Sequence, residues 1–176
     1  YREVLVRELS YNEQENLKSP WWKWQKSDGK LDMAALVDAF LAWWRVQEQA
    51  VYAHGNKYYP EALPHLTFMA FLQRVVNGGG VIHREFAAGY GAIDLVVEYA
   101  GEKHVIELKR VKDRSLEDVL EEGLAQLAGY LDTMGEKSGW LLVFEQRPKM
   151  KSRSWEQRLW VKDVVVEGRQ IWVRGA

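Results

Sequence analysis

The sequence predicts an α/β domain, because two kinds of periodicity alternate along the chain. Apolar residues recur at helical spacing in the first half of the chain and again near residue 120. Between and after these stretches, short segments alternate apolar and polar residues or are apolar throughout, which is typical of strands. The length of 176 residues is that of one ordinary domain. We therefore expect one core with at most a short additional segment.

The composition excludes several classes of protein. With 47% hydrophobic and 28% charged residues, the chain is expected to fold rather than to stay disordered. The 24 basic and 25 acidic residues give a net charge of -1, so any binding of nucleic acid must be local. The chain has no cysteine, which rules out disulfides and thiolate metal sites. Because it has neither a signal peptide nor a long apolar run, we expect a soluble, cytoplasmic protein with no membrane partner.

The N-terminal third of the chain is predicted to begin as a loop-rich segment over residues 1–30. Helical spacing then predicts a helix over 31–53, which Gly55 ends. Together they form a Trp-rich lead-in, residues 1–56, that we expect to pack on the main domain, residues 57–176. Buried anchors are the simplest role for the nine tryptophans. Since the first residue is tyrosine rather than methionine, we expect the chain to belong to a longer polypeptide.

A helix and three strands are predicted next. The helix runs up to residue 76, because Pro60 and Pro64 stand where a helix can start and a glycine run follows it. The three strands form a predicted meander, over 81–86, 92–99 and 103–109. The last two strands are joined at residues 100–102, which would pair Tyr99 with Lys103.

The C-terminal part repeats the change from helix to strand. Helical spacing predicts a helix over 116–134, which Gly135 ends. The run 140–144 is apolar throughout, as expected of a strand that is covered on both faces. After a polar loop over 145–154, two strands are predicted as a closing hairpin, over 158–166 and 170–173.

Two carboxylates and a lysine fall within the predicted meander. Alternation along 91–97 sends Ile93, Leu95 and Val97 to one face and Asp94 to the other. Glu107 and Lys109 are two residues apart, so they share a face of their strand. In the expected register, Asp94 lies opposite Leu108 and therefore beside both of them.

This grouping is costly in a half-buried sheet unless the charges compensate one another or a metal ion does so. Carboxylate oxygens together with a backbone carbonyl suit Mg²⁺ or Mn²⁺. A bound metal and a nearby lysine can activate water for attack on a phosphodiester. The residues themselves therefore point to phosphodiester hydrolysis.

Asp94, twelve residues and then Glu107-Leu108-Lys109, in the order helix, three strands, helix, strand, resembles the PD-(D/E)XK nuclease superfamily. The stretch 28–160 is also similar to the C-terminal nuclease-like domain of a bacterial family whose N-terminal part is a predicted AAA-type ATPase. The segments that carry this second resemblance are 28–33, 60–66, 71–80, 84–86 and 106–109. The resemblance implies a restriction-endonuclease-like core and a possible ATPase domain or subunit as partner.

The resemblance also assigns roles to individual residues. It implies that Asp94 and Glu107 ligate the metal with the carbonyl of Leu108, and that Lys109 is catalytic. A helix glutamate often completes such sites, with Glu61 as the first candidate. The second candidate is Glu85 on the first strand. Gln126 and Tyr130, at i and i+4 of a helix, match the Gln-x-x-x-Tyr feature beside many such sites.

Two departures from the superfamily pattern concern the residues before Asp94. Ile93 replaces the usual proline, and Ala92 stands where relatives often have an arginine that contacts phosphate. One histidine, His65, lies one turn after Glu61 and within reach of the site. For Glu61 itself, a favourable position near a helix N-terminus is an equally good structural explanation.

Basic residues near the candidate site are the candidates for nucleic-acid contact. One group lies beside the Glu-x-Lys motif and one lies in a polar loop. With the tyrosine of the helix, the candidates are Lys109, Arg110, Lys112, Arg114, Tyr130, Arg147, Lys149, Lys151 and Arg153. Solvated loops are the alternative explanation for either group.

No nucleotide-binding P-loop, serine-hydrolase elbow or HExxH zinc motif is present in the sequence. The expected function is therefore metal-dependent nuclease activity, with DNA as the expected substrate. The alternative is an inactive nuclease-fold domain that serves as a binding or regulatory module of a larger ATPase. The sequence leaves the oligomeric state open.

Overall fold

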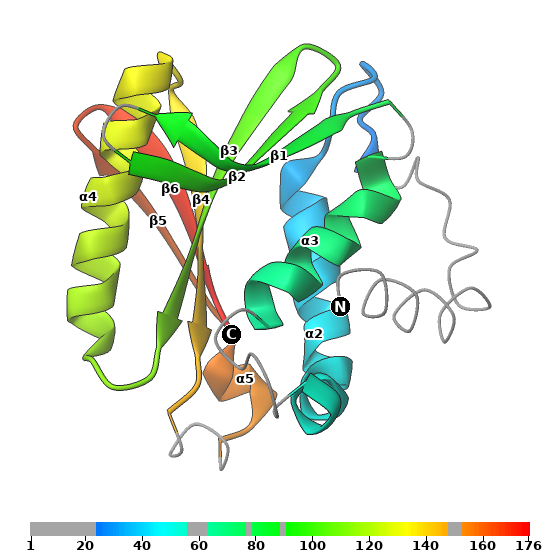
Figure 1. Ribbon diagram of the computed structural model, residues 1–176, viewed down its shortest axis with the longest axis vertical. Helices are drawn as coiled ribbons and strands as arrows, with labels where there is room; N and C mark the ends of the chain where they lie inside the picture. The colour runs from blue at the N-terminus through cyan, green and yellow to red at the C-terminus, as the bar shows by residue number, and fades with distance from the viewer. Residues whose placement is uncertain (1–23, 56–62, 77–78, 89–90, 148–152) are drawn as a thin grey trace.

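The computed structural model describes residues 24–55, 63–76, 79–88, 91–147 and 153–176 (Figure 1). In chain order the elements are α2 (Met33–Gly55), α3 (Leu63–Val76), β1 (Val81–Ala88), β2 (Gly91–Tyr99), β3 (Glu102–Val111), α4 (Leu116–Met134), β4 (Ser138–Glu145), α5 (Trp155–Arg158), β5 (Trp160–Val166) and β6 (Arg169–Gly175). Each predicted helix and strand has a counterpart among them. The described part of the chain is a mixed α/β structure.

One six-stranded sheet in the order β1-β2-β3-β4-β6-β5 forms the centre of the molecule. The antiparallel pairing of β1 with β2 and of β2 with β3 confirms the predicted meander. β4 pairs parallel with both β3 and β6, and β5 is an antiparallel edge strand. Parallel neighbours need a crossover connection, and α4 supplies it between β3 and β4.

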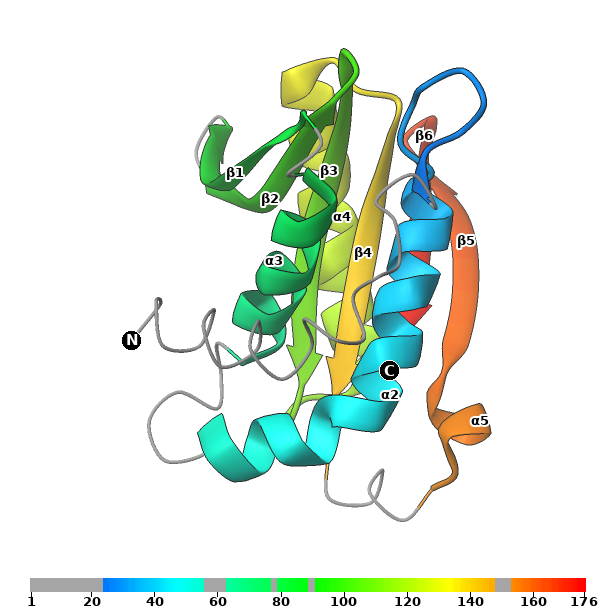
Figure 2. The ribbon, with the colours of Figure 1, turned by 90° about the vertical axis from the view of Figure 1, so that its right-hand side faces the viewer.

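Helices cover both faces of this sheet. Figures 1 and 2 show α4 on one face and α2 and α3 on the other. Alternating side chains of the strands therefore enter two apolar clusters. The cluster on the α4 side includes Val105, Leu127 and Leu141. The cluster on the α2 side includes Phe40 and Phe144.

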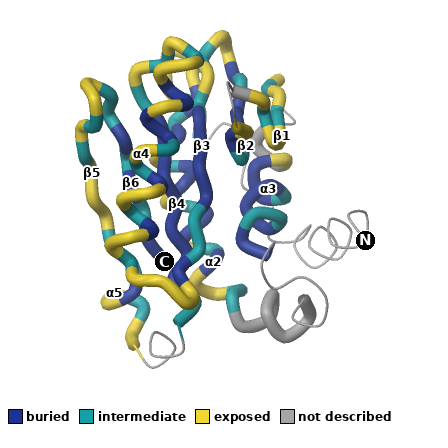
Figure 3. Tube along the Cα trace, turned by 60° about the vertical axis from the view of Figure 1, so that its left-hand side comes forward, coloured by how far each residue is buried: buried dark blue, intermediate teal, exposed yellow. Residues whose placement is uncertain are grey.

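The predicted double burial of the strand over 140–144 is confirmed. β4 is buried along its length except at Ser138, and Figure 3 shows the central strands as the most buried part of the sheet. A parallel strand between two layers of helices has no solvated face, so its sequence has no polar alternation.

The tight turn between β2 and β3 corrects the predicted register by one residue. Tyr99 pairs with Glu102 rather than with Lys103. The two turn residues, Ala100 and Gly101, have φ values of 49° and 78°. Two positive φ values match the twist of the adjoining strands, which favours this two-residue turn. The new register places Asp94 level with Glu107 instead of Leu108.

The segment after β4 also differs from the prediction. The short helix α5 lies between the predicted loop and the predicted strand and includes the first residue of that strand, Arg158. β5 begins at Trp160. Arg158 explains the difference, because its buried guanidinium forms an ion pair with Glu48 at 2.7 Å and lies 3.8 Å from the ring of Trp155. These contacts hold the segment against α2.

The Trp-rich segment contributes to the core through α2. Trp44 is fully buried within the same cluster as strands β2, β3 and β4. Trp21, Trp22 and the predicted boundary near residue 56 lie outside the described residues. Among the described helices, none has the length and apolar character needed to cross a bilayer.

Candidate active site

β2 and β3 stop pairing where the predicted site begins. The last pair in that direction joins Leu95 and Ile106. One residue further, Oδ2 of Asp94 accepts a hydrogen bond from the backbone N–H of Leu108 at 2.8 Å. The Asp94 side chain therefore satisfies a backbone donor of β3 at the point where the two strands separate.

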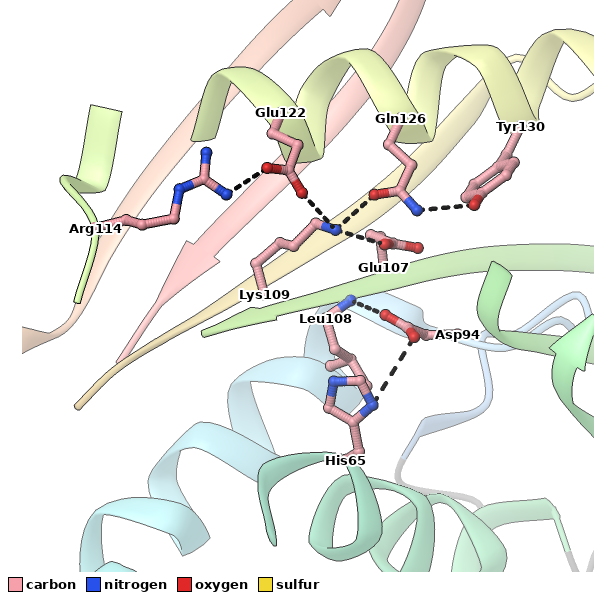
Figure 4. Close-up of polar contacts among 9 residues, drawn as sticks. All are labelled: His65, Asp94, Glu107, Leu108, Lys109, Arg114, Glu122, Gln126 and Tyr130. Carbon is pink, nitrogen blue, oxygen red and sulfur yellow. Dashed lines mark hydrogen bonds and ion pairs between the residues drawn. The ribbon is translucent and has the colours of Figure 1, made fainter. Parts of the chain in front are cut away.

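The predicted alternation is wrong at both Ile93 and Asp94, which exchange sides of the sheet relative to Leu95 and Val97. Ile93 packs in the α4-side cluster, whereas Leu95 and Val97 pack in the α2-side cluster. The neighbouring strand is irregular at the same level, because Glu85 of β1 has a φ of 48° and does not pair there. Asp94 faces α3, where its Oδ1 lies 3.8 Å from Nδ1 of His65. It therefore lies on the other side of β3 from Glu107 and Lys109 rather than on the predicted common face (Figure 4).

Glu107 is the most deeply buried charged group of the site, with 2% of its surface exposed. Its Oε1 lies 3.1 Å from Nζ of Lys109, and its Oε2 is buried without a hydrogen-bond partner. Burial first, and the negative charge of Asp94 second, raise the pKa of Glu107 to about 7. Lys109 and, to a smaller extent, the backbone N–H of Asp94 oppose the rise.

Lys109 joins β3 to α4. Its Nζ donates to Oε1 of Gln126 at 2.5 Å and lies 3.6 Å from Oε1 of Glu122. Nε2 of Gln126 in turn donates to the hydroxyl of Tyr130 at 2.8 Å (Figure 4). The chain of contacts holds the lysine amine beside the Glu107 carboxyl group.

Two glycines permit the close approach of α4. A Cβ atom on Gly123 would lie 3.1 Å from Cγ of Lys109 and 3.1 Å from Cδ1 of Leu141. A Cβ atom on Gly91 would lie 2.6 Å from the hydroxyl of Tyr130. Larger side chains at these positions would therefore displace the residues that hold Lys109.

The structure adds Glu122 to the predicted site and pairs it with Arg114, one of the basic residues expected there. Glu122 contacts Lys109 and forms an ion pair with Arg114, which precedes α4. Glu122, Gln126 and Tyr130 occupy positions i, i+4 and i+8 of one helix face. Extending the predicted Gln126–Tyr130 pair by one turn toward the N-terminus would have identified Glu122.

The remaining predicted residues have different surroundings. Glu85 is exposed on β1, and Tyr130 is buried. Arg153 is exposed, and Lys112 lies 3.9 Å from Asp113. Glu61, Lys149 and Lys151 lie outside the described residues.

Two of the predicted basic residues have partners near the ends of β3 and β4. Nη1 of Arg110 lies 3.5 Å from Oε1 of Gln146. Arg147 forms an ion pair with the buried carboxylate of Glu145. Part of the charge of the predicted polar loop is therefore compensated within the protein.

The donor set fits a hard divalent cation in its chemistry. Glu107 Oε2 is a buried acceptor without a partner, and the Asp94 carboxylate is close enough to raise the pKa of Glu107. Oxygen donors of this kind suit Mg²⁺ or Mn²⁺. Within the described ranges, no group of three or more His, Asp or Glu side chains is placed to hold a metal. Water, the substrate or the Leu108 carbonyl would have to complete the coordination.

Comparisons with known proteins do not extend this description. No family model, no curated protein and no solved structure matches the chain.

Proposed function

We propose that this protein is a metal-dependent nuclease that hydrolyses phosphodiester bonds in DNA, built on a restriction-endonuclease-like core. The observation that carries the proposal is the juxtaposition of the buried Glu107 carboxyl group, whose Oε2 has no partner, with the Lys109 amine 3.1 Å from its other oxygen. A purely structural ion pair is expected to satisfy both oxygens of a buried carboxylate.

Asp94, Glu107 and the carbonyl of Leu108 would hold Mg²⁺ or Mn²⁺. The bound metal supplies Lewis-acid chemistry, which activates water and stabilises negative charge on a phosphate. Lys109 carries a positive charge at the same place. Its three donors face oxygens of Glu107, Glu122 and Gln126, so a water molecule or a phosphate oxygen would take the place of one of these partners. Gln126 fixes the position of its amine, and Tyr130 fixes Gln126.

Contacts to the DNA backbone are assigned to the basic residues beyond β3. Lys112 and Arg114 are exposed and follow Lys109 within five residues. Arg153 is exposed after the polar loop. Positive side chains beside the site would bind neighbouring phosphates, so binding is expected to weaken with salt.

The test is cleavage of supercoiled, linear and single-stranded DNA with Mg²⁺, with Mn²⁺ and with a chelator. Lys109→Met keeps an unbranched apolar side chain against Gly123, and Asp94→Asn keeps an oxygen that can accept from Leu108. Both variants are expected to lose activity by about a hundredfold or more, the usual order of effect when a catalytic group is removed. Lys162→Met, at an exposed position of the edge strand β5, is the control and should cut as the unmodified protein does.

Metal-dependent cutting that survives both site substitutions would overturn the assignment of the site. Circular dichroism of each variant separates loss of chemistry from loss of fold. Cleavage of RNA in place of DNA would correct the substrate and leave the assigned residues unchanged.

A second function is favoured by one specific observation. The Lys109 amine is already surrounded by oxygens of Glu107, Glu122 and Gln126. A nuclease fold whose lysine is compensated in this way can serve as an inactive binding or regulatory module, for instance of a larger ATPase. Folded protein that binds DNA with Mg²⁺ or Mn²⁺ present but cuts none of the three substrates would support this function over the first.

A further inference from the structure

A second polar feature lies on the α2-side face of the sheet. A cavity of about 580 Å³ separates the start of α2 from β4 and β6 and reaches the β2–β3 turn. The lining includes Trp140 of β4 and His104 of β3. It also includes Trp172 and Arg174 of β6. None of these four residues belongs to the candidate active site.

Two aromatic rings form one wall of the cavity. The ring centroids of Trp140 and Trp172 lie 5.0 Å apart with an angle of 36° between the planes. The guanidinium of Arg174 lies 5.3 Å from the Trp140 ring and binds Asp163 at 2.8 Å. Trp172 is only half-buried, so part of its surface remains open to a planar ligand.

Two of the residues that line the cavity each have a buried nitrogen without a hydrogen-bond partner. These nitrogens are Nε1 of Trp140, a residue with 3% of its surface exposed, and Nε2 of His104. Burial lowers the pKa of His104, so the imidazole is neutral at neutral pH and carries one donor and one acceptor. Buried polar groups of native proteins usually have partners, so unsatisfied ones beside a cavity point to a ligand that supplies them.

The charges around the cavity are nearly balanced. Three cationic side chains and four carboxylates line it, namely Lys26, Lys103, Arg174, Asp32, Glu102, Asp163 and Glu136. Glu102 is also bound to Lys30 at 2.7 Å. A balanced lining gives no advantage to a phosphate or to a free cation, whereas it offers donors and acceptors to a neutral ring.

We propose that this cavity binds a nucleobase, stacked on Trp172 and hydrogen-bonded to Trp140 and His104. The base belongs either to a free nucleoside or to an unpaired nucleotide of a strand. His104 and Glu107 lie three residues apart on β3, a rise of about 10 Å, but they project from opposite faces of the sheet. Base binding is independent of the proposed function. Only the idea that the bound nucleic-acid strand is also the substrate of the candidate active site rests on it.

Binding is measured by calorimetry in the Lys109→Met background, which leaves the cavity intact and prevents cleavage. The probes are adenosine, thymidine, a ten-residue thymidine strand and a duplex. Trp172→Ala removes the stacking surface and is expected to weaken binding about tenfold or more. Trp140→Phe removes the N–H but keeps a ring, and is expected to weaken binding by about three- to tenfold.

Trp160→Phe is the matched control. Trp160 also has a buried Nε1 without a partner, but it packs on the α4-side cluster, away from the cavity. This variant should bind the probes as the unmodified protein does. Unfolding curves of all three variants show that the fold is retained.

The outcomes separate the two sources of the base. Saturable binding of nucleosides and strand alike supports a pocket for a free ring, and binding of the strand alone supports an unpaired nucleotide of a nucleic acid. The proposal would be overturned by no binding of any probe or by binding of the duplex alone. It would also be overturned if the affinity were unchanged in Trp172→Ala and equal in Trp140→Phe and Trp160→Phe. Base binding by Lys109→Met, together with an unmodified protein that cuts no DNA, would retain this proposal and reject the nuclease.

Discussion

Glu107 and Lys109 share one face of β3 but have different surroundings. Lys109 reaches three side-chain oxygens, whereas Glu107 has one oxygen next to Lys109 and the other in a buried position without a partner. An ionised carboxylate is poorly stabilised there, so the pKa of Glu107 rises to about 7. The protonation state of this single residue therefore changes near neutral pH.

The raised pKa makes a prediction about stability in the absence of metal. The folded state holds a proton that the unfolded chain releases above its ordinary pKa of 4.5, so stability from this group is present at low pH and is lost as pH rises to about 7. Glu107→Gln cannot ionise. Relative to the unmodified protein, the free energy of unfolding of Glu107→Gln is expected to increase by up to about 3 kcal/mol between pH 4.5 and 7.

Urea unfolding at pH 5, 6, 7 and 8 with chelator present measures this difference. Glu121→Gln, at an exposed position of α4, reports the effect of removing one negative charge from the surface. Parallel curves for Glu107→Gln and the unmodified protein across this range would contradict the prediction.

The parts of the site that lie within one element could be predicted from the sequence. Glu107 and Lys109 share a face because strand side chains repeat every two residues, and Gln126 and Tyr130 share one because helix side chains repeat every three to four. The exact register and facing of neighbouring elements could not be predicted. The level of Asp94 depends on whether the turn at Ala100 has two or three residues, and the side to which it points depends on the break near Glu85.

α4 shows how one helix sets the geometry of the candidate site. Its N-terminus is fixed by Ser115, whose hydroxyl accepts from the backbone N–H of Asp118 at 3.0 Å, and Gly135 ends it with a φ of 70°. Between these ends, Gly123 is buried against Lys109 and Leu141, whereas Gly129 has nothing within 4 Å of an added Cβ.

This contrast gives a matched pair of substitutions in α4. Gly129→Ala is expected to stabilise the protein by about 0.5–1 kcal/mol, because alanine loses less backbone entropy in a helix. Gly123→Ala has the same benefit but crowds Lys109 and Leu141, and is expected to be less stable than Gly129→Ala by about 1–3 kcal/mol. Urea unfolding of both variants measures the difference, and equal stabilisation would show that α4 does not pack closely on β3 at this position.

For the whole molecule, the sequence predicts the kind and order of the elements better than their arrangement. Periodicity distinguishes helices from strands because each buries one side of its own surface. The position of β6 between β4 and β5 is set by pairing over a long distance in the chain, and no local pattern records it. The short helix α5 was missed for a related reason, since its contacts with Glu48 come from a distant part of the chain.

Whether the Trp-rich lead-in is part of the core is a question for the whole molecule, and two adjacent tryptophans of α2 test it. Trp44 is 1% exposed and lies 5.5 Å from the ring of Phe144 on β4, whereas Trp43 is only half-buried. Trp44→Ala is expected to destabilise the protein by about 3–5 kcal/mol, because it leaves a cavity between α2 and the sheet. Trp43→Ala should cost clearly less, since solvent already reaches that ring. Equal and small losses in urea unfolding would mean that α2 is a separate unit, and the core would then have to be redrawn without residues before 57.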